Sequence, residues 1–571
     1  MRELLKHFHE LSLHPKNAKE LKGLILQLAI QGKLTEEWRK LNLGIATNVQ
    51  SISKEIDKSV LLIEKESTNL DGIKIPATWI KLKFKSFMDM QGGSQPPKST
   101  FITEKREGYT RLFQIRDFGN RPNPVYVPTN KVSKFCSTED IMIGRYGASI
   151  GKIFYGKEGA YNVALVRLLW SSAILSQDFV FYLFTSKYLQ VFFQNCSRSA
   201  QAGFNKTDIG KLIIPIPPIE EQQEIKEVVE TLFKEVEALK NLTEKRIELK
   251  KNYATSALNQ LAKNDSKGEW QALKPHFQSF FDEVDNIKKL RGTILQLAVQ
   301  GKLTVKWRAQ NPQLISGANS AENLLKEIKA EKAKLVKAKK IKKEKALPPF
   351  SEDEIPYELP EGWVWCRFQS LFEELIYGTS KKCDYGLGDT PVLRIPNLVN
   401  GGIDLNDLKS TDLTEKEVAK LSLEEDDLLI IRSNGSLNLV GKSSIIDKKA
   451  VGFSYAGYLI RIRPFKSHLY SYFLHLVLES PFIRESIEVP IRSTSGVKNI
   501  NTTEVSQLLF SLPSIEEQKV IVEKVNSLLA LCDHLEYKIN TGQQQIEALM
   551  QSVLNEVFEG EKEMEKVTTY N

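Results

Sequence analysis

Apolar residues at helical spacing mark one stretch near the N-terminus, and the chain repeats this stretch later. Within Leu21–Leu28 they fall at i, i+3, i+4 and i+7, which predicts a helix with one buried face. Residues 290–308 (LRGTILQLAVQGKLTVKWR) repeat residues 21–39 (LKGLILQLAIQGKLTEEWR) at an offset of 269. A repeat of this length, with its Gly and Trp positions in register, indicates that the chain consists of two similar halves.

Residue types also predict where the repeated helix begins and ends. Asn17 and Asn286 lie just before the apolar turns, where an N-cap is expected. Gly32 and Gly301 follow the last apolar turn, where a C′ glycine ends a helix. Both halves are therefore expected to begin with the same capped helix.

From residue 75 the helical period gives way to short alternating runs separated by Gly and Asn clusters, which predict short strands and long loops. In the first half these runs are Arg111–Asp117, Asp140–Arg145, Lys152–Tyr155 and Ala164–Leu169. Asp178–Gln194 predicts a helix, and the polar stretch 42–71 predicts one short amphipathic helix. Each half is thus expected to contain a mixed α/β unit.

Each half ends on a sequence that starts a long helix. The pattern Pro-x-Ile-Glu-Glu-Gln occurs at 217–222 and again at 513–518, with proline and acidic residues where a helix N-terminus favours them. After the second copy, apolar residues alternate by four and three. They are Ile521, Val525, Leu528, Cys532, Leu535, Ile539, Gly542, Ile546, Leu549 and Val553. Such a seam predicts helix-on-helix pairing; a helix that only covers its own domain is the alternative.

Composition narrows the class of protein. A chain of 571 residues with 41% hydrophobic and 26% charged residues is expected to form several soluble domains. No apolar run reaches the roughly 18 residues of a membrane span, and the N-terminus shows no secretory apolar segment. The five cysteines include no C-x-x-C pair, which argues against a zinc ribbon and suits a reducing compartment. We expect a cytoplasmic protein without membrane contact.

Motifs for catalysis are approached but not completed. Gly435–Ser443 resembles a phosphate-binding loop, but five residues separate its glycines where that geometry requires four. Asn123–Tyr126 (Asn-Pro-Val-Tyr) resembles an amino-methyltransferase motif, but no glycine-rich cofactor loop follows a strand. No Pro-Asp dipeptide, His-Glu-x-x-His or Gly-x-Ser-x-Gly is present. We therefore expect a protein that is not an enzyme, with no catalytic residues, no cofactor and no metal site.

The loops of the two units share polar, basic and glycine-rich sequences. Arg, Asn and Gln make paired contacts to guanine and adenine edges, and Lys and Ser suit phosphates. In the first unit the candidate DNA-binding residues are Gln91, Ser94, Lys98, Gln114, Arg116, Arg145, Tyr146, Lys152, Arg198, Gln201, Asn205 and Lys206. In the second they are Thr379, Lys381, Lys382, Arg394, Asn397, Arg432, Asn434, Lys442, Arg492, Ser493, Lys498 and Asn499. For any single loop, an ordinary surface turn is the alternative.

Positive charge is distributed unequally. Residues 80–215 contain 19 Lys and Arg against 9 Asp and Glu, a net charge of +10, whereas residues 363–512 contain 17 against 18. Nine acids of the second stretch crowd into Asp404–Asp427, and we expect them on a face turned away from DNA. Glu322–Lys345 contains ten lysines, which is typical of a solvated helix face or of contact with a nucleic-acid backbone.

Taken as a set, several of these sequences resemble one known family. They are the doubled helix block, Leu-Pro-Glu-Gly-Trp-Val-Trp at 359–365, Leu-Arg-Ile-Pro-Asn at 393–397 and the two Pro-x-Ile-Glu-Glu-Gln helix starts. The chain resembles the specificity subunits of type I restriction–modification systems over nearly its whole length. The resemblance implies an α+β fold with two target-recognition domains separated by long paired helices. It also implies a subunit that recognises a split site on double-stranded DNA and directs other subunits to it.

Under this resemblance we divide the chain into five regions. They are an N-terminal helical region (1–72), target-recognition domain 1 (73–217), a central helical region (218–346), target-recognition domain 2 (347–513) and a C-terminal helical region (514–571). Catalysis is then expected in two methyltransferase subunits and in restriction subunits. The candidate contacts to these partners are Glu220, Glu221, Gln222, Glu516, Glu517 and Gln518. A single-chain DNA modification enzyme and a coiled-coil scaffold without DNA binding are the alternatives.

Overall fold

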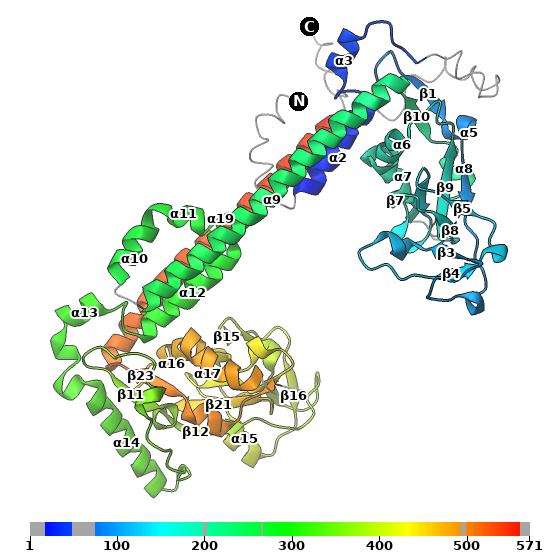
Figure 1. The fold of residues 1–571 in the computed structure, drawn as a ribbon. Coiled ribbons are helices and arrows are strands. Elements are labelled where there is room, and N and C mark those ends of the chain that lie inside the picture. Colours follow the sequence, from blue (N-terminus) through cyan, green and yellow to red (C-terminus); the bar gives the residue numbers. More distant parts are fainter. Residues whose placement is uncertain (1–16, 48–74, 198–202, 264–265, 493–497, 560–571) are drawn as a thin grey trace, which may run out of the picture. The chain divides into compact units, whose positions relative to one another are not determined.

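The computed structural model describes residues 17–47, 75–197, 203–263, 266–492 and 498–559 (Figure 1). These residues belong to two compact units. The first comprises residues 1–248 and 542–571, and the second comprises residues 249–541. Each unit contains one repeated helix, one mixed α/β domain and parts of two long helices. The predicted α+β class and the internal repeat are confirmed.

The helices of the first unit begin with the repeated one and end with a long one. They are α2 (Asn17–Ile30), α3 (Glu36–Leu41), α5 (Phe84–Phe87), α6 (Gln177–Thr185), α7 (Lys187–Ser197), α8 (Lys206–Ile209), the first part of α9 (Ile219–Lys263) and the end of α19 (Ile515–Glu559). The strands are β1 (Ile80–Lys83), β2 (Met88–Gly92), β3 (Tyr109–Phe113), β4 (Tyr126–Pro128), β5 (Phe135–Cys136), β6 (Ile141–Gly144), β7 (Ile153–Tyr155), β8 (Gly159–Tyr161), β9 (Leu165–Trp170) and β10 (Ile213–Ile216).

Two four-stranded sheets form the α/β domain of the first unit, in the orders β2-β9-β6-β7 and β4-β3-β8-β5. All four residues of β6 are buried because both faces of its sheet are covered. Ile141 and Ile143 join the core under helix α6, whereas Met142 joins a cluster with Phe113 and Tyr161 of the second sheet. This is the alternation expected for a strand, with period two.

The second unit repeats this architecture and adds helices. Its helices are the end of α9, α10 (Ser266–Leu273), α11 (Phe277–Phe280), α12 (Val284–Val299), α13 (Val305–Gln310), α14 (Ala321–Lys337), α15 (Glu415–Leu421), α16 (Ser471–Glu479), α17 (Pro481–Arg492), α18 (Thr502–Gln507) and the first part of α19 (Ile515–Glu559). Its longer strands are β11 (Val364–Arg367), β12 (Phe372–Tyr377), β13 (Thr390–Leu393), β16 (Lys409–Thr411), β17 (Leu428–Ile431), β19 (Ser443–Ile445), β21 (Leu459–Pro464) and β23 (Leu509–Leu512). Two-residue strands are β14 (Leu398–Val399), β15 (Gly402–Ile403), β18 (Ser433–Asn434), β20 (Ser454–Tyr455) and β22 (Lys498–Asn499).

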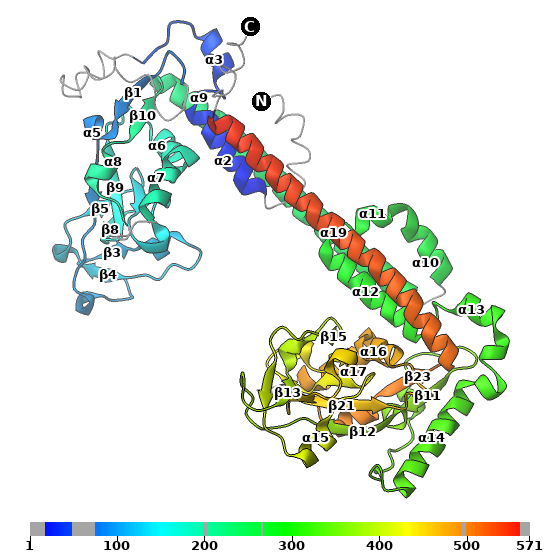
Figure 2. The ribbon, with the colours of Figure 1, turned by 180° about the vertical axis from the view of Figure 1, so that it is seen from behind.

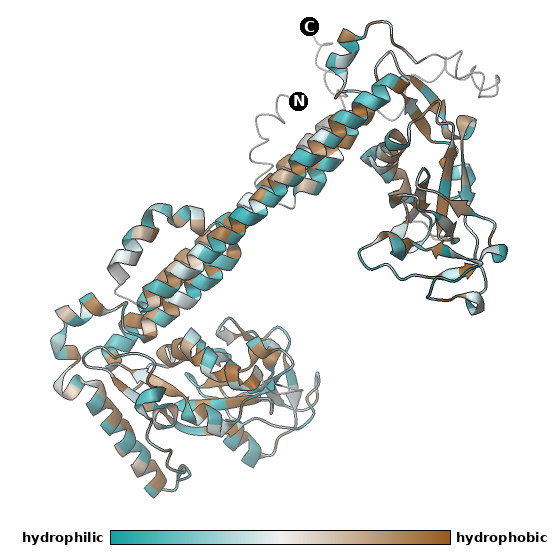
Figure 3. Cartoon of the chain, in the orientation of Figure 1, coloured by the Kyte–Doolittle hydropathy of each residue, from teal (hydrophilic) through white to brown (hydrophobic). Residues whose placement is uncertain are grey.

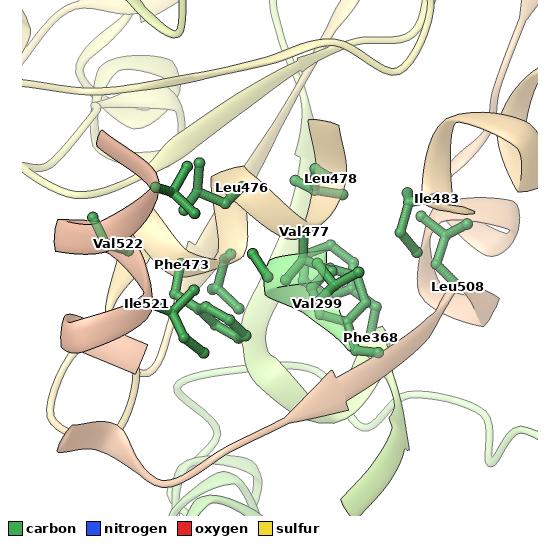
Figure 4. Packing of buried hydrophobic residues seen from close by; sticks show 14 of the residues in the cluster. Val299, Phe368, Phe473, Leu476, Val477, Leu478, Ile483, Leu508, Ile521 and Val522 are labelled. Atoms are coloured by element: carbon green, nitrogen blue, oxygen red, sulfur yellow. The ribbon is translucent and has the colours of Figure 1, made fainter. Parts of the chain in front are cut away.

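The main sheet of the second unit has the order β12-β21-β17-β19, which matches β2-β9-β6-β7 element by element. Strand β17 is again buried on both faces. Leu428 and Ile430 pack toward α16, where Phe473 and Val477 lie, whereas Leu429 belongs to a separate cluster on the other face. Figure 4 shows Phe473 and Val477 among the packed side chains of this core.

Long helices pack against the repeated helix inside each unit. In the first unit, Leu21 and Leu24 of α2 cluster with Val236 of α9 and Leu549 of α19, and Figure 2 shows this part of α19 beside α2. In the second unit, residues of α12 cluster with the end of α9 and with Ile521, Val525 and Cys532 of α19. Every seam residue from Ile521 to Leu549 is at least partly buried. Helix-on-helix pairing is confirmed, and it includes α2 and α12.

The predicted C′ glycines are confirmed. Gly32 and Gly301 have φ of 69° and 65°, the left-handed region that suits glycine. Lys33 N–H donates to the carbonyl of Leu28 at 2.9 Å, and Lys302 N–H to that of Leu297 at 2.9 Å, as in a Schellman turn.

Two sequence predictions of helix boundaries are wrong. Asn286 is not an N-cap, because α12 starts earlier at Val284, and its side chain donates to the carbonyl of Phe280 instead. The helix expected over 178–194 is two helices, because Ser186 between them has extended backbone. The amphipathic helix expected within 42–71 lies mostly outside the described residues. Among the described helices, none is both long and apolar enough to cross a membrane.

Candidate nucleic-acid interface

Each unit contains one buried carboxylate that collects hydrogen bonds from separate segments. In the first unit this is Glu221, which is fully buried. Its Oε1 accepts hydrogen bonds from Thr35, at 2.6 Å, and from Arg39. Its Oε2 accepts one from Nε1 of Trp79 at 2.8 Å. Arg39 also donates to the carbonyl of Gly32 at 2.6 Å, so the turn that ends α2 belongs to the same network.

The second unit repeats this network at Glu517. Thr304 and Arg308 both donate to its Oε1 at 2.6 Å, and Nε1 of Trp363 donates to Oε2 at 2.9 Å. We call each set of four residues the anchor network. In each network, three repeated sequence blocks meet at one carboxylate. In the first unit they supply Thr35 with Arg39, Trp79, and Glu221 itself, and each block recurs in the second half at a different offset. A buried charge needs the paired cation and the hydrogen-bond donors that these blocks provide.

The glutamine after each buried glutamate fixes the start of the long helix. Gln222 accepts a hydrogen bond from Ser176 N–H at 2.7 Å and donates to the carbonyls of Ile174 and Pro217. Gln518 likewise accepts from Tyr470 N–H at 3.0 Å and donates to the carbonyl of Pro513. Both glutamines therefore join the long helix to the domain beside it.

This arrangement narrows the predicted partner contacts. Glu221, Gln222, Glu517 and Gln518 are at most 1% exposed, and their polar atoms are used inside the fold. A buried side chain presents no group to a second protein, so the sequence interpretation of these four as partner contacts does not fit the structure. Glu220 is exposed and Glu516 is half-buried, so the partner hypothesis is left with these two.

In the first unit, candidate reading residues gather where β6 ends. The guanidinium of Arg145 lies over the ring of Tyr146, with 5.1 Å from Cζ to the ring centroid. A Cβ placed on Gly92, at the end of β2, would lie 3.7 Å from this guanidinium. A Cβ placed on Gly203 would lie 3.4 Å from the Tyr146 ring. Three loops far apart in the sequence thus meet at this arginine, and Tyr146 is 45% exposed.

In the second unit, the same place holds Arg432, which follows β17. Its guanidinium lies over the ring of Tyr377, 4.4 Å from the centroid, and its Nε donates to Oδ1 of Asn499 at 3.3 Å. The next residues, Ser433 and Asn434, form β18 and pair with β22. Again the ends of β12 and β17 and the segment before α18 meet at one arginine.

The two arginines occupy equivalent positions, each as the first residue after a central strand of matching sheets. Stacking on an aromatic ring restricts the guanidinium without using its outer donors. A guanidinium held in this way can donate two parallel hydrogen bonds to the N7 and O6 of guanine. The geometry therefore suits base reading in both units.

Comparison with known proteins identifies the family of the chain. Residues 76–249 and 360–547 match the family described as the type I restriction modification DNA specificity domain, which is more than half of the chain. The chain belongs to this family. Each match begins just before the tryptophan of an anchor network and includes the glutamate that this tryptophan contacts.

Relatives of the family are similar to the chain at modest identity. The specificity subunit of the type I restriction enzyme EcoAI from Escherichia coli is 31% identical over 58% of this chain and 55% of that protein. The EcoKI specificity subunit from Escherichia coli K12 is 26% identical over 86% of this chain and 90% of that protein. The chain therefore spans about half of EcoAI and most of EcoKI. The crystal structure of the HsdS subunit from Thermoanaerobacter tengcongensis matches 85% of this chain with a TM-score of 0.41 and 15% identity.

Some residues that we predicted to contact DNA shape the specificity domains instead. Asn205 accepts a hydrogen bond from Asp208 N–H at 3.0 Å and so caps helix α8. Gln114 contributes only its backbone, whose N–H donates to Asp117 at 2.8 Å within a turn, so its half-buried side chain stays a candidate. Asn397 is 1% exposed and donates to the carbonyls of Asp404 and Asp407. Capping explains why short polar side chains recur in these loops without any ligand.

Other predicted DNA contacts are paired with acids. Lys381 contacts Glu417 at 2.8 Å, and Arg394 contacts Asp407 at 2.9 Å. Hydrogen bonds from Lys381 and Thr414 lower the pKa of Glu417 to about 2. Two of the acids of 404–427 therefore lie beside candidate contacts, although we expected this stretch on a face turned away from DNA. In the first unit, Lys206 pairs with Asp89 at 2.7 Å.

The remaining candidates lie on the loops, and not all of them are described. Exposed or half-buried candidates are Gln91, Ser94, Lys98, Arg116, Lys152, Lys382, Asn434, Lys442, Lys498 and Asn499. Thr379 is buried and accepts a hydrogen bond from Lys381 N–H at 3.1 Å. Arg198, Gln201 and Ser493, and the side chain of Arg492, lie outside the described residues. Within the described part of the chain, no group of three or more His, Cys, Asp and Glu could hold a metal ion.

The structure adds two kinds of residue to the candidate interface. Tyr377 supports Arg432 in the second unit, and Gly92 and Gly203 leave room beside Arg145 and Tyr146 in the first. An aromatic residue at a strand end next to a glycine, as in Tyr377-Gly378, was the available sequence signal. Its partner could not be inferred, because the two lie 55 residues apart in the chain.

Proposed function

We propose that the chain is a sequence-specific DNA-binding subunit that recognises a bipartite site, one half with each specificity domain. The observation that carries this proposal is the recurrence of one arrangement, Arg145 with Tyr146 and Arg432 with Tyr377, at equivalent strand ends. Each arginine offers donors suited to a guanine edge in the major groove. Family membership supports DNA as the ligand.

We also infer that the chain directs other subunits to the site. Relatives are named as specificity subunits of restriction enzymes, which supports partners that methylate and cut. Glu220 and Glu516 lie in equivalent first turns of α9 and α19, so each half has a similar acidic surface at the start of its long helix. Two like surfaces suit two copies of a methyltransferase related by pseudo-twofold symmetry. Restriction subunits would join this complex in the cytoplasm.

The five-region division of the chain remains part of the proposal. Helices α9 and α19 each contain 45 residues, so each would span about 67 Å at about 1.5 Å per residue. We propose that they act as the spacer between recognition domain 1 and recognition domain 2, and so set the number of unread bases between half-sites.

The test is DNA binding by the pure full-length chain, alone and with a methyltransferase of the same system. We expect retention of duplexes that contain the site and no methyl transfer from labelled S-adenosylmethionine by the chain alone. Methyl transfer by the pure chain would show a single-chain modification enzyme. No DNA retention in either condition would show a scaffold. The sequence read is obtained from the methylated bases of a genome that carries this protein.

Modularity gives a second test. Replacing residues 80–215 with the equivalent domain of another specificity subunit should change one half of the methylated site. A change in both halves would contradict one domain per half-site.

A further inference from the structure

Helix α14 and the turn after it, which precede the second specificity domain, concentrate positive charge on one surface of the second unit. Helix α14 and the turn after it contain ten lysines between Lys326 and Lys345. The helix rests on the core through Ala321, Leu324 and Ile328, which are buried. Figure 3 shows hydrophobic and hydrophilic positions alternating along this helix. The exposed lysines are Lys326, Lys329, Lys334, Lys337, Lys339, Lys340, Lys342, Lys343 and Lys345. We call these nine the lysine ridge.

Three of the four acids of this segment contact His468 or Lys332, and the fourth, Glu322, is exposed. Glu331 contacts Nε2 of His468 at 2.8 Å, and Glu327 lies 3.7 Å from its Nδ1. Glu344 contacts Lys332, the one lysine that is not exposed, at 2.6 Å. Consequently no residue of the lysine ridge forms an ion pair within the described part of the chain. Residues 321–345 contain ten lysines and four glutamates, so the segment carries a net charge of +6.

The backbone at the end of α14 places one lysine where glycine is usual. Lys339 has a φ of 57°, and Lys340 N–H donates to the carbonyl of Leu335 at 3.0 Å, so this is a Schellman turn with lysine at C′. The left-handed region is unfavourable for a residue with a side chain. At the ends of α2 and α12 the same position holds glycine. Here a lysine occupies this position despite the unfavourable backbone.

The positive charge of this segment lies next in sequence to a specificity domain that has no net positive charge of its own. The first specificity domain, residues 80–215, carries +10, whereas residues 363–512 carry 17 basic and 18 acidic residues. The stretch of the first half that corresponds to the ridge, residues 40–75, contains five lysines and five acids. Phosphate neutralisation supplies most of the sequence-independent affinity of a protein for DNA. The ridge segment, with its net charge of +6, therefore adds positive charge beside a domain whose own net charge is −1.

We propose that the lysine ridge binds the phosphate backbone of duplex DNA outside the bases that the second specificity domain reads. This rests on the proposed function of that domain. Lys332 donates to the carbonyl of Phe372, the first residue of β12, at 3.0 Å and so holds α14 at the start of this strand. Tyr377, which stacks on Arg432, is the last residue of the same strand. A six-residue strand is about 17 Å long, which corresponds to about five base pairs. The ridge would thus bind phosphates of base pairs that lie beyond those contacted by Arg432.

The test compares two variants of the full-length chain that lose the same charge. The ridge variant is K334Q/K337Q/K340Q/K343Q. The control variant, K416Q/K420Q/K448Q/K449Q, removes four exposed lysines of the specificity domain of the same unit. Circular dichroism and thermal unfolding establish that both fold. The probe is a labelled duplex of about 30 base pairs without the recognition site, titrated by fluorescence anisotropy at several salt concentrations.

We expect the dependence of log affinity on log salt to become shallower by about two to four for the ridge variant, since each lost phosphate contact removes about 0.9. The control variant should keep the wild-type slope. Equal slopes for the wild type and the ridge variant would overturn the proposal. Loss of a partner subunit from the ridge variant with unchanged DNA binding would assign the ridge to a protein and overturn it as well.

A second measurement separates this proposal from the proposed function. A duplex that contains the site is compared with and without ten flanking base pairs on each side. Flanks should strengthen binding by the wild type and by the control variant, and should have little effect on the ridge variant. If the wild type showed no preference for the site, the proposed function would fail, and the salt slopes on unrelated DNA would still decide the role of the ridge.

Discussion

Nε1 of Trp79 donates a 2.8 Å hydrogen bond to Oε2 of Glu221, and this contact joins the residue before the first strand of a specificity domain to the helix after its last strand. The anchor network therefore ties together the two ends of the domain, and it includes neither Arg145 nor Tyr146 of the candidate interface. Stability and recognition are therefore expected to respond to different substitutions.

The anchor network predicts a large loss of stability when its carboxylate is removed. Glu221→Ala leaves Arg39, Thr35 and Trp79 without their acceptor and should lower the free energy of unfolding of the first unit by about 3–5 kcal/mol. Urea unfolding followed by tryptophan fluorescence measures this loss. The control is Glu220→Ala, which removes the exposed neighbouring carboxylate and should change stability by no more than about 0.5 kcal/mol. Equal effects of the two substitutions would show that the network contributes nothing.

Glycines of helix α2 should respond in opposite directions to alanine. At Gly32 the φ of 69° is unfavourable for alanine, and its Cβ would come within 2.5 Å of Cγ of Pro76, so Gly32→Ala should destabilise the first unit by about 1–3 kcal/mol. At Gly23, inside the helix, a Cβ would meet nothing within 4 Å, so Gly23→Ala should stabilise it by about 0.5–1 kcal/mol. Thermal unfolding of both variants checks the signs, and a neutral Gly32→Ala would contradict the role of the turn.

Sequence reasoning predicted the elements of this protein better than the roles of its polar residues. The apolar period and the C′ glycines correctly predicted α2, α12 and their C-terminal ends, because these depend on residues close in the chain. The glutamate of each Ile-Glu-Glu-Gln was interpreted as a partner contact, although Glu221 meets Trp79 at a separation of 142 residues. Likewise Asn397 and Asn205 were assigned to DNA, but capping a turn requires the same side chain. Local patterns do not show which groups meet across the fold.

The two arginines should govern separate halves of the DNA site. Arg145→Ala should weaken binding of the cognate duplex by about 1–3 kcal/mol and relax specificity in one half-site, because a bidentate contact to guanine contributes about this much. Arg432→Ala should do the same in the other half-site. Maps of methylated bases from cells with each variant measure the result. Relaxation in the same half-site by both variants would refute the assignment of one domain to each half.

An acid beside a candidate DNA contact should limit affinity. Hydrogen bonds from Lys381 and from the backbone and side chain of Thr414 lower the pKa of Glu417 to about 2. Its charge is therefore present at every pH of a binding assay and is lost only as the pH falls through this value. Glu417→Gln removes the negative charge that pairs with Lys381, whose Nζ keeps its hydrogen bond to the carbonyl of Asp412 at 3.0 Å, and should raise affinity for the cognate duplex about two- to five-fold more than the control Glu415→Gln. Glu415 is an exposed neighbour with the same charge, so equal gains for both variants would indicate a general charge effect.

Helix length should set the gap between half-sites. Four residues inserted after Leu239 of α9, with four more inserted beside Leu549 of α19, lengthen both helices by about 6 Å and nearly keep their apolar phase. The unread gap in the methylated sequence should grow by about two base pairs while the bases read stay the same. Two-residue insertions at these places rotate the apolar face by about 200° and should abolish assembly. An active four-residue variant with an unchanged gap would rule out the helices as the spacer.

The pairing of β1 with β10, and of β11 with β23, has a consequence for how such chains diversify. Ile80 lies opposite Ile216, and Val364 lies opposite Leu512, so each domain leaves its scaffold at two neighbouring backbone positions about 5 Å apart. A foreign domain can be grafted here if its own ends are adjacent, whatever its internal length or loop chemistry. Recombination between genes that encode such subunits can then exchange a complete specificity domain at these two strand positions. The helical scaffold, including its buried glutamate, stays unchanged.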